Sequence, residues 1–174
     1  MKSGSERKLT GQVGEFLVCA QLGTMGYYAS PYSGNMPGFD VTAVNPTTLK
    51  SFPIQVKTSN TDTMLRTTID HWIEYNIVDE NKYQFGEKKK LKHPNMIWIL
   101  VQLKENSIKE PVFFICTEQQ IQDLVINGFV SYMNKNGGRG PRGGISPHAT
   151  LSTEQLKDFK EKWNLLDEIS KSHI

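Results

Sequence analysis

The stretch Gly38–Lys57 constrains the fold of this 174-residue chain most strongly, because its pattern is that of a β-hairpin. Asp40 opens the apolar and β-branched run Val41–Val44, which is typical of a short strand. Asn45–Thr48 supply turn residues, and Phe52–Thr58 has the composition of a returning strand. The sequence therefore predicts two neighbouring antiparallel strands joined by a tight connection.

The returning strand has one apolar and one polar face. Side chains alternate across a strand, so Ile54 and Val56 point toward a core while Gln55 and Lys57 point to the opposite face. Asp40 shares that polar face. A carboxylate, an amide oxygen and an ammonium gathered at one strand pair suit metal-assisted hydrolysis of a phosphodiester, because oxygen ligands hold a hard cation such as Mg²⁺.

This constellation resembles the PD-(D/E)XK nuclease superfamily, in which an Asp on one strand is followed on the next by an acidic residue, any residue and a Lys. The matching positions are Asp40, Gln55 and Lys57. Upstream, Gly11–Glu15 on an expected helix, followed by Gly26–Tyr27, resembles the front end of Holliday-junction-resolvase-like and restriction-endonuclease-like members. Motifs support the resemblance over roughly the first third of the chain, and element order supports it over the remainder.

The resemblance implies a metal-dependent endonuclease that hydrolyses phosphodiester bonds in DNA. It implies one Mg²⁺ or Mn²⁺ held by Asp40, the Gln55 amide oxygen and the backbone carbonyl of Val56. A helix glutamate often completes the metal site in such proteins, and Glu15 is the matching residue. Lys57 would contact the attacking water. Because such enzymes often cut two strands, a homodimer is also implied.

Gln55 departs from the family pattern, since an acidic residue is usual at its position. An amide oxygen can still bind a hard cation, but it contributes no charge. The alternative is therefore a catalytically degenerate protein that binds nucleic acid or a protein partner without cleaving. A third interpretation is a plain interaction protein in which Asp40 and Lys57 form a structural ion pair.

Composition predicts a soluble globular protein, with 37% hydrophobic and 22% charged residues, folded as a single domain over residues 1–174. No apolar run approaches the ~20 residues that a membrane helix needs, and the first residues lack the apolar stretch of a signal peptide. A cytoplasmic protein is the expectation. Cys19 and Cys116 are interpreted as free thiols that pack as small hydrophobic side chains.

The net charge of +2 does not by itself indicate nucleic-acid binding, but the basic residues are clustered. A lysine-rich run around residue 90 and a glycine-rich loop over residues 134–144, expected to be flexible, could neutralise phosphates. A solvated loop and a plain linker are the alternatives. The resemblance adds Ser33 and Asn35, from the loop before the hairpin, as candidate contacts. The end of the returning strand adds the hydroxyl of Thr58. The candidate nucleic-acid contacts are Ser33, Asn35, Thr58, Lys88, Lys89, Lys90, Arg139 and Arg142.

The first helix is predicted to begin at Thr10, acting as N-cap, and to end at Met25, with Gly26 in the left-handed conformation. A strand over Tyr27–Ser30 follows. One apolar stripe defines the predicted buried face of the helix, and it consists of Val13, Phe16, Leu17 and Ala20.

The middle of the chain is predicted to hold a helix over Thr68–Glu80 and then two strands, Met96–Val101 and Val112–Cys116, that pair as neighbours. A capping box, Thr117–Gln120, predicts a helix that stops at Gly128.

A short edge strand is expected at Phe129–Met133. A second capping box, formed by Ser152 and Gln155, begins a predicted C-terminal helix over residues 153–170. Its apolar stripe consists of Leu156, Phe159, Trp163, Leu166 and Ile169.

The predicted element order is helix, three strands, helix, two strands and helix. This order indicates an α/β fold and agrees with a restriction-endonuclease-like three-layer core, in which a mixed central sheet of about five strands is flanked by helices.

Overall fold

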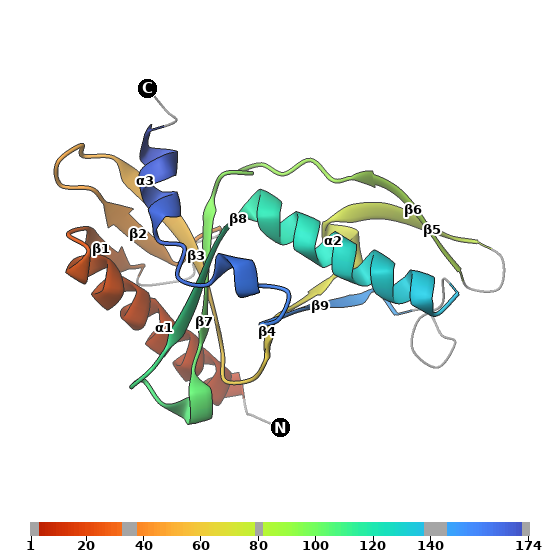
Figure 1. The fold of residues 1–174 in the computed structure, drawn as a ribbon, viewed down its shortest axis with the longest axis horizontal. Helices are drawn as coiled ribbons and strands as arrows, with labels where there is room; N and C mark the ends of the chain where they lie inside the picture. The colour runs from red at the N-terminus through yellow and green to blue at the C-terminus, as the bar shows by residue number, and fades with distance from the viewer. Residues whose placement is uncertain (1–3, 33–37, 79–81, 138–145, 172–174) are drawn as a thin grey trace.

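A computed structural model describes residues 4–32, 38–78, 82–137 and 146–171. Its centre is a five-stranded sheet with the strand order β1-β2-β3-β7-β8. Only β3 and β7 run parallel, and the other neighbours are antiparallel. The predicted α/β class with a mixed sheet of five strands is confirmed (Figure 1). The strands are β1 (Tyr28–Pro31), β2 (Val41–Val44), β3 (Ser51–Ser59), β7 (Ile97–Gln102) and β8 (Val112–Thr117).

Helices cover both faces of this sheet, which gives the predicted three layers. The helix α1 (Gly4–Thr24) packs on one face, and α2 (Glu118–Lys135) packs on the other. The central strand β7 is apolar throughout because alternate side chains enter the two cores. Ile99 is buried on the α1 side, and Leu100 is buried on the α2 side.

The helix α1 begins earlier than predicted. It starts at Gly4, and Thr10 lies inside it, where the Thr10 hydroxyl donates a hydrogen bond to the Glu6 carbonyl at 2.8 Å. The end is as expected, because Gly26 has φ 86°. The amide of the following residue, Tyr27, donates to the Leu22 carbonyl at 3.0 Å, which closes the Schellman turn.

The predicted buried face of α1 is wrong at Val13, Phe16 and Ala20, whereas Leu17 packs against the core as predicted. Gly14, Val18 and Leu22 face the sheet, whereas Phe16 is 55% exposed and Val13 is 36% exposed. The reason is the close approach of the helix to β3. A Cβ atom at Gly14 would lie 1.8 Å from Oγ1 of Thr58, so only a glycine lets the helix come this near.

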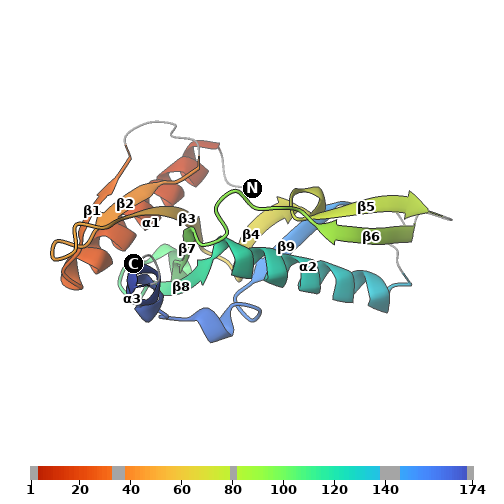
Figure 2. The same cartoon turned by 90° about the horizontal axis from the view of Figure 1, so that it is seen from above.

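An arm extends from the sheet where a helix was predicted over Thr68–Glu80 (Figures 1 and 2). That helix is absent among the described residues of the range, which form strands and one 3₁₀ turn instead. The pairs are β4 with β9 and β5 with β6, both antiparallel, and we call these four strands and the helix α2 the arm. The strands are β4 (Thr63–Thr68), β5 (Ile73–Val78), β6 (Lys82–Lys88) and β9 (His148–Ser152).

The capping box before α2 is confirmed, since Thr117 and Gln120 exchange hydrogen bonds between side chain and backbone. The helix does not stop at Gly128, however, and the predicted edge strand Phe129–Met133 is helical. Phe129 and Met133 fill the core of the arm, so burial favours continuing the helix. The side-chain amide of Gln155 packs against Gly128 within the helix.

The predicted C-terminal helix over residues 153–170 is also wrong. Ser152 and Gln155 form the expected reciprocal hydrogen bonds, but a turn and a 3₁₀ segment follow, and α3 spans only Asn164–Lys171. The apolar stripe is divided because Leu156 is buried on the α2 side of the sheet and Leu166 on the α1 side. Within the described residues, no helix is long and apolar enough to cross a membrane.

Candidate metal and phosphodiester site

Asp40 stands where β2 and β3 separate. The pairing of the two strands ends at Val41 opposite Ile54, and the Asp40 amide donates to the Ile54 carbonyl at 2.9 Å. The predicted hairpin is thus confirmed. Beyond this point β3 has no backbone partner on its β2 side among the described residues, which leaves room for side chains.

The Asp40 carboxylate lies beside β3 at this point and accepts a backbone hydrogen bond that a neighbouring strand would otherwise accept. Its Oδ2 atom accepts a hydrogen bond from the Val56 amide at 2.8 Å and another from Nε2 of Gln55. The N–H and C=O of one strand residue point to the same side, so the Val56 carbonyl is also directed toward Asp40. These contacts fix the carboxylate and bring together three of the predicted ligands.

Lys57 lies on the same face of β3 as Gln55, as the strand alternation predicts. Its Nζ atom stands 5.9 Å from the centre of the Trp98 ring, within reach of a cation–π interaction. Among the described residues no ion pair joins Asp40 to Lys57, so the structural ion pair of the third interpretation is not formed.

Glu15 reaches the same site from α1. Its side chain is half-buried beside Gly14, and burial raises its pKa, with the negative charge of Asp40 adding to the rise and the positive charge of Lys57 opposing it. Both charges act on Glu15, so the helix and the hairpin supply one electrostatic cluster. Asp40 and Gln55 are in direct contact, and Glu15 lies near enough to Asp40 and Lys57 for their charges to act on its pKa.

The donors suit a hard cation held partly by water. The described residues contain no group of three or more His, Cys, Asp or Glu side chains that could enclose a metal ion. Mg²⁺ nonetheless needs only one or two carboxylates when waters and substrate phosphates complete its octahedron. Glu15 and Asp40 provide two, and both hydrogen bonds to Asp40 fall on Oδ2, which leaves Oδ1 for a cation.

Gln55 is turned so that its amide nitrogen faces Asp40. Its oxygen would become a metal ligand only after the amide rotated by half a turn. An acidic residue in this place would repel Asp40, whereas the amide donates to it. The glutamine therefore stabilises the carboxylate in the absence of a cation.

The candidate nucleic-acid contacts have mixed outcomes. The Thr58 hydroxyl is buried beneath α1, so the prediction that it contacts phosphate is wrong. Lys88 pairs with Asp123 at 2.7 Å, which neutralises its charge. Lys89 and Lys90 are exposed. Four candidates lie outside the described residues: Ser33, Asn35, Arg139 and Arg142.

The two cysteines are free thiols, as expected. Cys116 is fully buried, and burial raises its pKa to about 12. Cys19 is half-buried one helical turn from Glu15, and burial followed by the Glu15 charge raises its pKa. Neither is a reactive thiolate.

Sequence reasoning missed two residues that shape the site. Gly14 sets the distance between α1 and β3, and the spacing of Gly11 and Gly14 on one helix was the available signal. Trp98 lies under the Lys57 ammonium, but its apolar neighbours on β7 gave no indication of that role.

No protein-family model matches the chain, and no curated protein sequence does either. Among solved structures, the bacterial homing endonuclease I-Ssp6803I is similar over 96% of this chain and 98% of its own, with 12% sequence identity and a TM-score of 0.46. The Holliday junction resolvase Hjc from Archaeoglobus fulgidus is similar over 80% of this chain and 88% of its own, with 9% identity and a TM-score of 0.37. At TM-scores this low, neither likeness decides what this chain does.

Proposed function

We propose that this chain is a metal-dependent endonuclease of the PD-(D/E)XK type that hydrolyses phosphodiester bonds in DNA. The observation that supports this most strongly is the meeting of Glu15, Asp40, Gln55 and Lys57 where β2 leaves β3. They come from α1, from β3 and from the residue before β2, and the charge of Asp40 and that of Lys57 both act on Glu15. Two carboxylates beside one ammonium are the groups that such a hydrolysis needs.

A bound Mg²⁺ or Mn²⁺ would supply a Lewis acid for the scissile phosphate and lower the pKa of a coordinated water. Asp40 and Glu15 would hold the cation, with the Val56 carbonyl and the Gln55 amide oxygen beside them. The hydrogen bond from the Val56 amide keeps Asp40 in position before any ligand arrives. Lys57 would orient the attacking water and offset negative charge on the phosphate.

The test is cleavage of a panel containing plasmid, linear duplex, four-way junction and single strands, with Mg²⁺, Mn²⁺ or EDTA. We expect metal-dependent cutting that falls by about a thousandfold or more in Asp40→Asn and in Lys57→Ala, because each removes a group that acts on the reacting phosphate. Lys57→Ala should keep most of its DNA affinity. Lys109→Ala, which removes an exposed lysine between β7 and β8, is the matched control and should cut normally. A fully active Lys57→Ala enzyme would remove this lysine from the chemistry.

A non-cleaving nucleic-acid-binding protein is the second candidate, and the hydrogen bond from Gln55 to Asp40 favours it. Because that bond satisfies the carboxylate without a cation, the site is stable in a protein that binds no metal. This candidate predicts salt-sensitive binding with no cutting across the panel. Gln55→Glu separates the two: cutting that appears only in this variant would identify the wild type as the degenerate form.

A further inference from the structure

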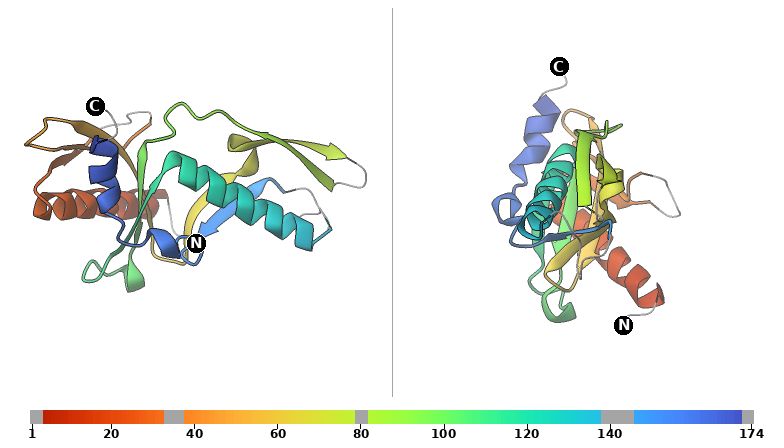
Figure 3. Two further views of the ribbon diagram at one scale, coloured as in Figure 1. Left: turned by 45° about the horizontal axis from the view of Figure 1, so that its top comes forward. Right: turned by 90° about the vertical axis from the view of Figure 1, so that its right-hand side faces the viewer.

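The face of β1, β2 and β3 that points away from α1 is open among the described residues. The core on the α2 side of the sheet is built from β7, β8 and the arm, and it includes no buried residue of these three strands. Figure 3 (left) shows the three strands above α1, with the arm extending away from them. We call this surface the open face, and it carries Tyr28, Ser30, Tyr32, Thr42, Ser51 and Pro53.

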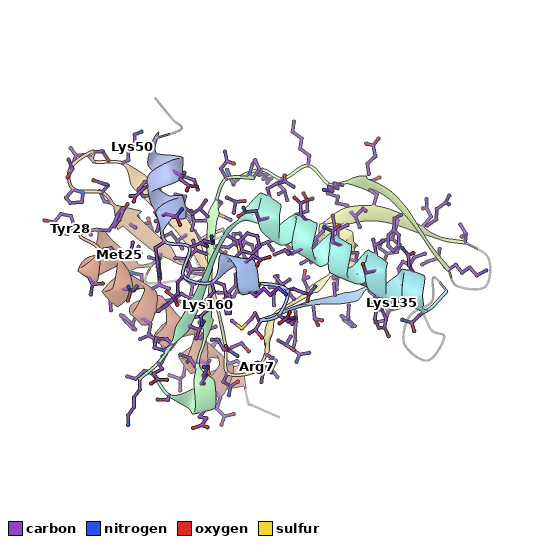
Figure 4. All side chains as sticks on the ribbon, in the orientation of Figure 1. Arg7, Met25, Tyr28, Lys50, Lys135 and Lys160 are labelled. Carbon is purple, nitrogen blue, oxygen red and sulfur yellow. The ribbon has the colours of Figure 1, made fainter. Side chains whose placement is uncertain are left out.

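Two exposed tyrosines stand on the open face. Tyr28 is 74% exposed and Tyr32 is 45% exposed. Ala29 packs against the core on the α1 side, so strand alternation directs its neighbours Tyr28 and Ser30 the opposite way. Figure 4 shows Tyr28 projecting from the edge of the molecule. The open face therefore presents aromatic rings to solvent.

Tyr32 lies directly beside the candidate site. Its amide donates to the Asp40 carbonyl at 2.8 Å, which extends the antiparallel pairing of β1 with β2 by one residue. Residues that face each other across such a pair have Cβ atoms about 5 Å apart, so the side chains of Tyr32 and Asp40 begin as neighbours. Gln55 and Lys57 leave β3 on this same face. The aromatic ring is thus continuous with the groups proposed to act on the phosphate.

The Tyr32 ring is supported by one neighbour and open elsewhere. It packs edge-to-face on Phe39, with the ring centroids 5.1 Å apart. A hollow of about 200 Å³ adjoins it, lined also by Ser30, Pro31 and Thr42. A supported aromatic ring beside a hollow suits stacking of a nucleobase, and hydroxyl groups at its side can hydrogen-bond the base edge.

Positive charge lies across the same face from the tyrosines. A cleft of about 520 Å³ opens where β3 extends beyond the start of β7, and Ser51 and Pro53 of the open face line it. Its basic lining residues are Lys50, Lys92 and His93, of which the last two are exposed. Because β1 and β3 flank β2, they lie about 10 Å apart. One short DNA strand can therefore reach both the aromatic and the basic groups.

We propose that the open face binds an unpaired DNA strand, with one base stacked on Tyr32, a second on Tyr28 and a backbone phosphate beside Lys92. The inference rests on the proposed function for the cut itself and adds the class of substrate, which is DNA that is single-stranded next to the scissile phosphate. Bases within an intact duplex are stacked on one another and offer no free face to a tyrosine. The open face thus selects unpaired DNA.

Fluorescence anisotropy in EDTA tests binding without metal-dependent cutting, and its probe is a labelled thymidine strand of about ten nucleotides. We expect the wild type to bind this DNA strand more tightly than a duplex of the same length. Tyr32→Ala should weaken binding about tenfold and Tyr28→Ala about threefold, whereas Tyr32→Phe keeps the ring and should bind normally. Tyr132→Ala removes a tyrosine of matched exposure, 44%, from α2 and should have no effect. Circular dichroism checks that each variant is folded.

The salt dependence of binding tests the phosphate contact. Lys92→Ala should lower the slope of log Kd against log salt concentration by about 0.7, the value for one phosphate contact on single-stranded DNA. Lys109→Ala is the control and should leave the slope unchanged. An unchanged slope in Lys92→Ala would overturn the assignment of this lysine to the backbone.

Failure of this inference and failure of the proposed function give different results. A protein that cuts nothing in the panel but binds the DNA strand through Tyr32 would retain the single-strand surface and lose the nuclease activity. If Tyr32→Ala and Tyr28→Ala bind the DNA strand as the wild type does, or if the wild type does not prefer it to the duplex, the single-strand surface is overturned. Metal-dependent cutting by that same protein would leave the proposed nuclease intact.

Discussion

The two sides of the central sheet are held together by different means. On the α1 side, a glycine brings a helix close to β3, and this helix also supplies Glu15, whereas Gln55 and Lys57 leave β3 on the opposite face. On the α2 side, aromatic rings of the arm fill a core, with Tyr83 and Phe85 packed against Phe129. Both sides bury apolar side chains, and the first side depends in addition on a close fit between helix and strand.

This difference separates chemistry from folding. The candidate site contributes little apolar burial, so its charged residues can change with little effect on the fold. The arm carries none of the four clustered site residues, and its removal would act on stability first. Variants of the candidate site should therefore change cleavage, and variants of the arm should change the free energy of unfolding.

Phe129→Ala in the arm should have the largest effect on stability. Phe129 is 6% exposed and its ring lies 5.5 Å from that of Tyr83, so the change leaves a cavity in the core. We expect a loss of about 3–5 kcal/mol in the free energy of unfolding, measured by urea titration. Tyr132→Ala, on the same helix and 44% exposed, should cost less than about 1 kcal/mol. Equal losses in the two variants would contradict the account of the arm.

Gln122→Leu should come next, because Gln122 is a polar residue of the arm that is only 1% exposed. Its Nε2 atom donates to the carbonyls of Trp72 and Lys89 at 2.9 and 2.8 Å, which ties α2 to both ends of the hairpin. The leucine fills similar space but removes the donor to the Lys89 carbonyl and one of the two donors to the Trp72 carbonyl, which keeps the Lys89 amide at 2.9 Å, so we expect a loss of about 1–3 kcal/mol. Asn127→Leu, at an exposed position of α2, is the control for placing leucine on this helix.

The site was predictable from sequence because its geometry is local. Asp40 directly precedes β2, Gln55 and Lys57 lie on β3, and the two strands pair through a short turn; alternation alone places Gln55 and Lys57 on one face. The first capping box is local in the same way, and α2 begins where Thr117 predicts.

The rest depended on partners that are distant in the sequence. The strand β4 pairs with β9, and Thr63 finds its partner in Ser152. Nothing near Thr63 indicates that pairing. The error over Thr68–Glu80 has another cause, because β5 pairs with the neighbouring β6, and the loose apolar spacing of the region was interpreted as helical. The second capping box formed its hydrogen bonds without a long helix, because Leu156 and Leu166 enter cores on opposite sides of the sheet.

Gly14→Ala tests the close approach on the α1 side. Its Cβ would meet the Thr58 side chain, so α1 must move, and we expect a loss of about 1–3 kcal/mol in the free energy of unfolding. Gly11→Ala is the matched control: nothing lies within 4 Å of its Cβ, and the change should stabilise the helix by up to about 1 kcal/mol. Thr58→Gly combined with Gly14→Ala should recover part of the loss, and strict additivity of the two changes would contradict the contact.

Glu15→Gln should have the smallest effect on stability. Whether it raises or lowers the melting temperature is nevertheless the most informative result. Burial and the Asp40 charge raise the pKa of Glu15, so the folded protein holds this proton more tightly than the unfolded chain does. The wild type therefore gains stability as pH falls through the raised pKa and loses it as pH rises again. In EDTA at pH 7 the glutamine variant should melt higher by about 1 °C, because solvent screens much of the repulsion at a half-buried carboxylate.

That difference should disappear below pH ~4, where Glu15 is protonated in both the folded and the unfolded chain. Thermal melts of the two proteins over pH 3.5–8 measure it, and a variant that melts lower than the wild type at pH 7 without metal would show that the ionised carboxylate stabilises the fold. Adding Mn²⁺ should reverse the order if the proposed function holds, because a cation binds the wild-type pair of carboxylates and stabilises the folded state by mass action. A metal ligand is expected to destabilise the metal-free protein and to stabilise the metal-bound one. A purely structural glutamate would do neither.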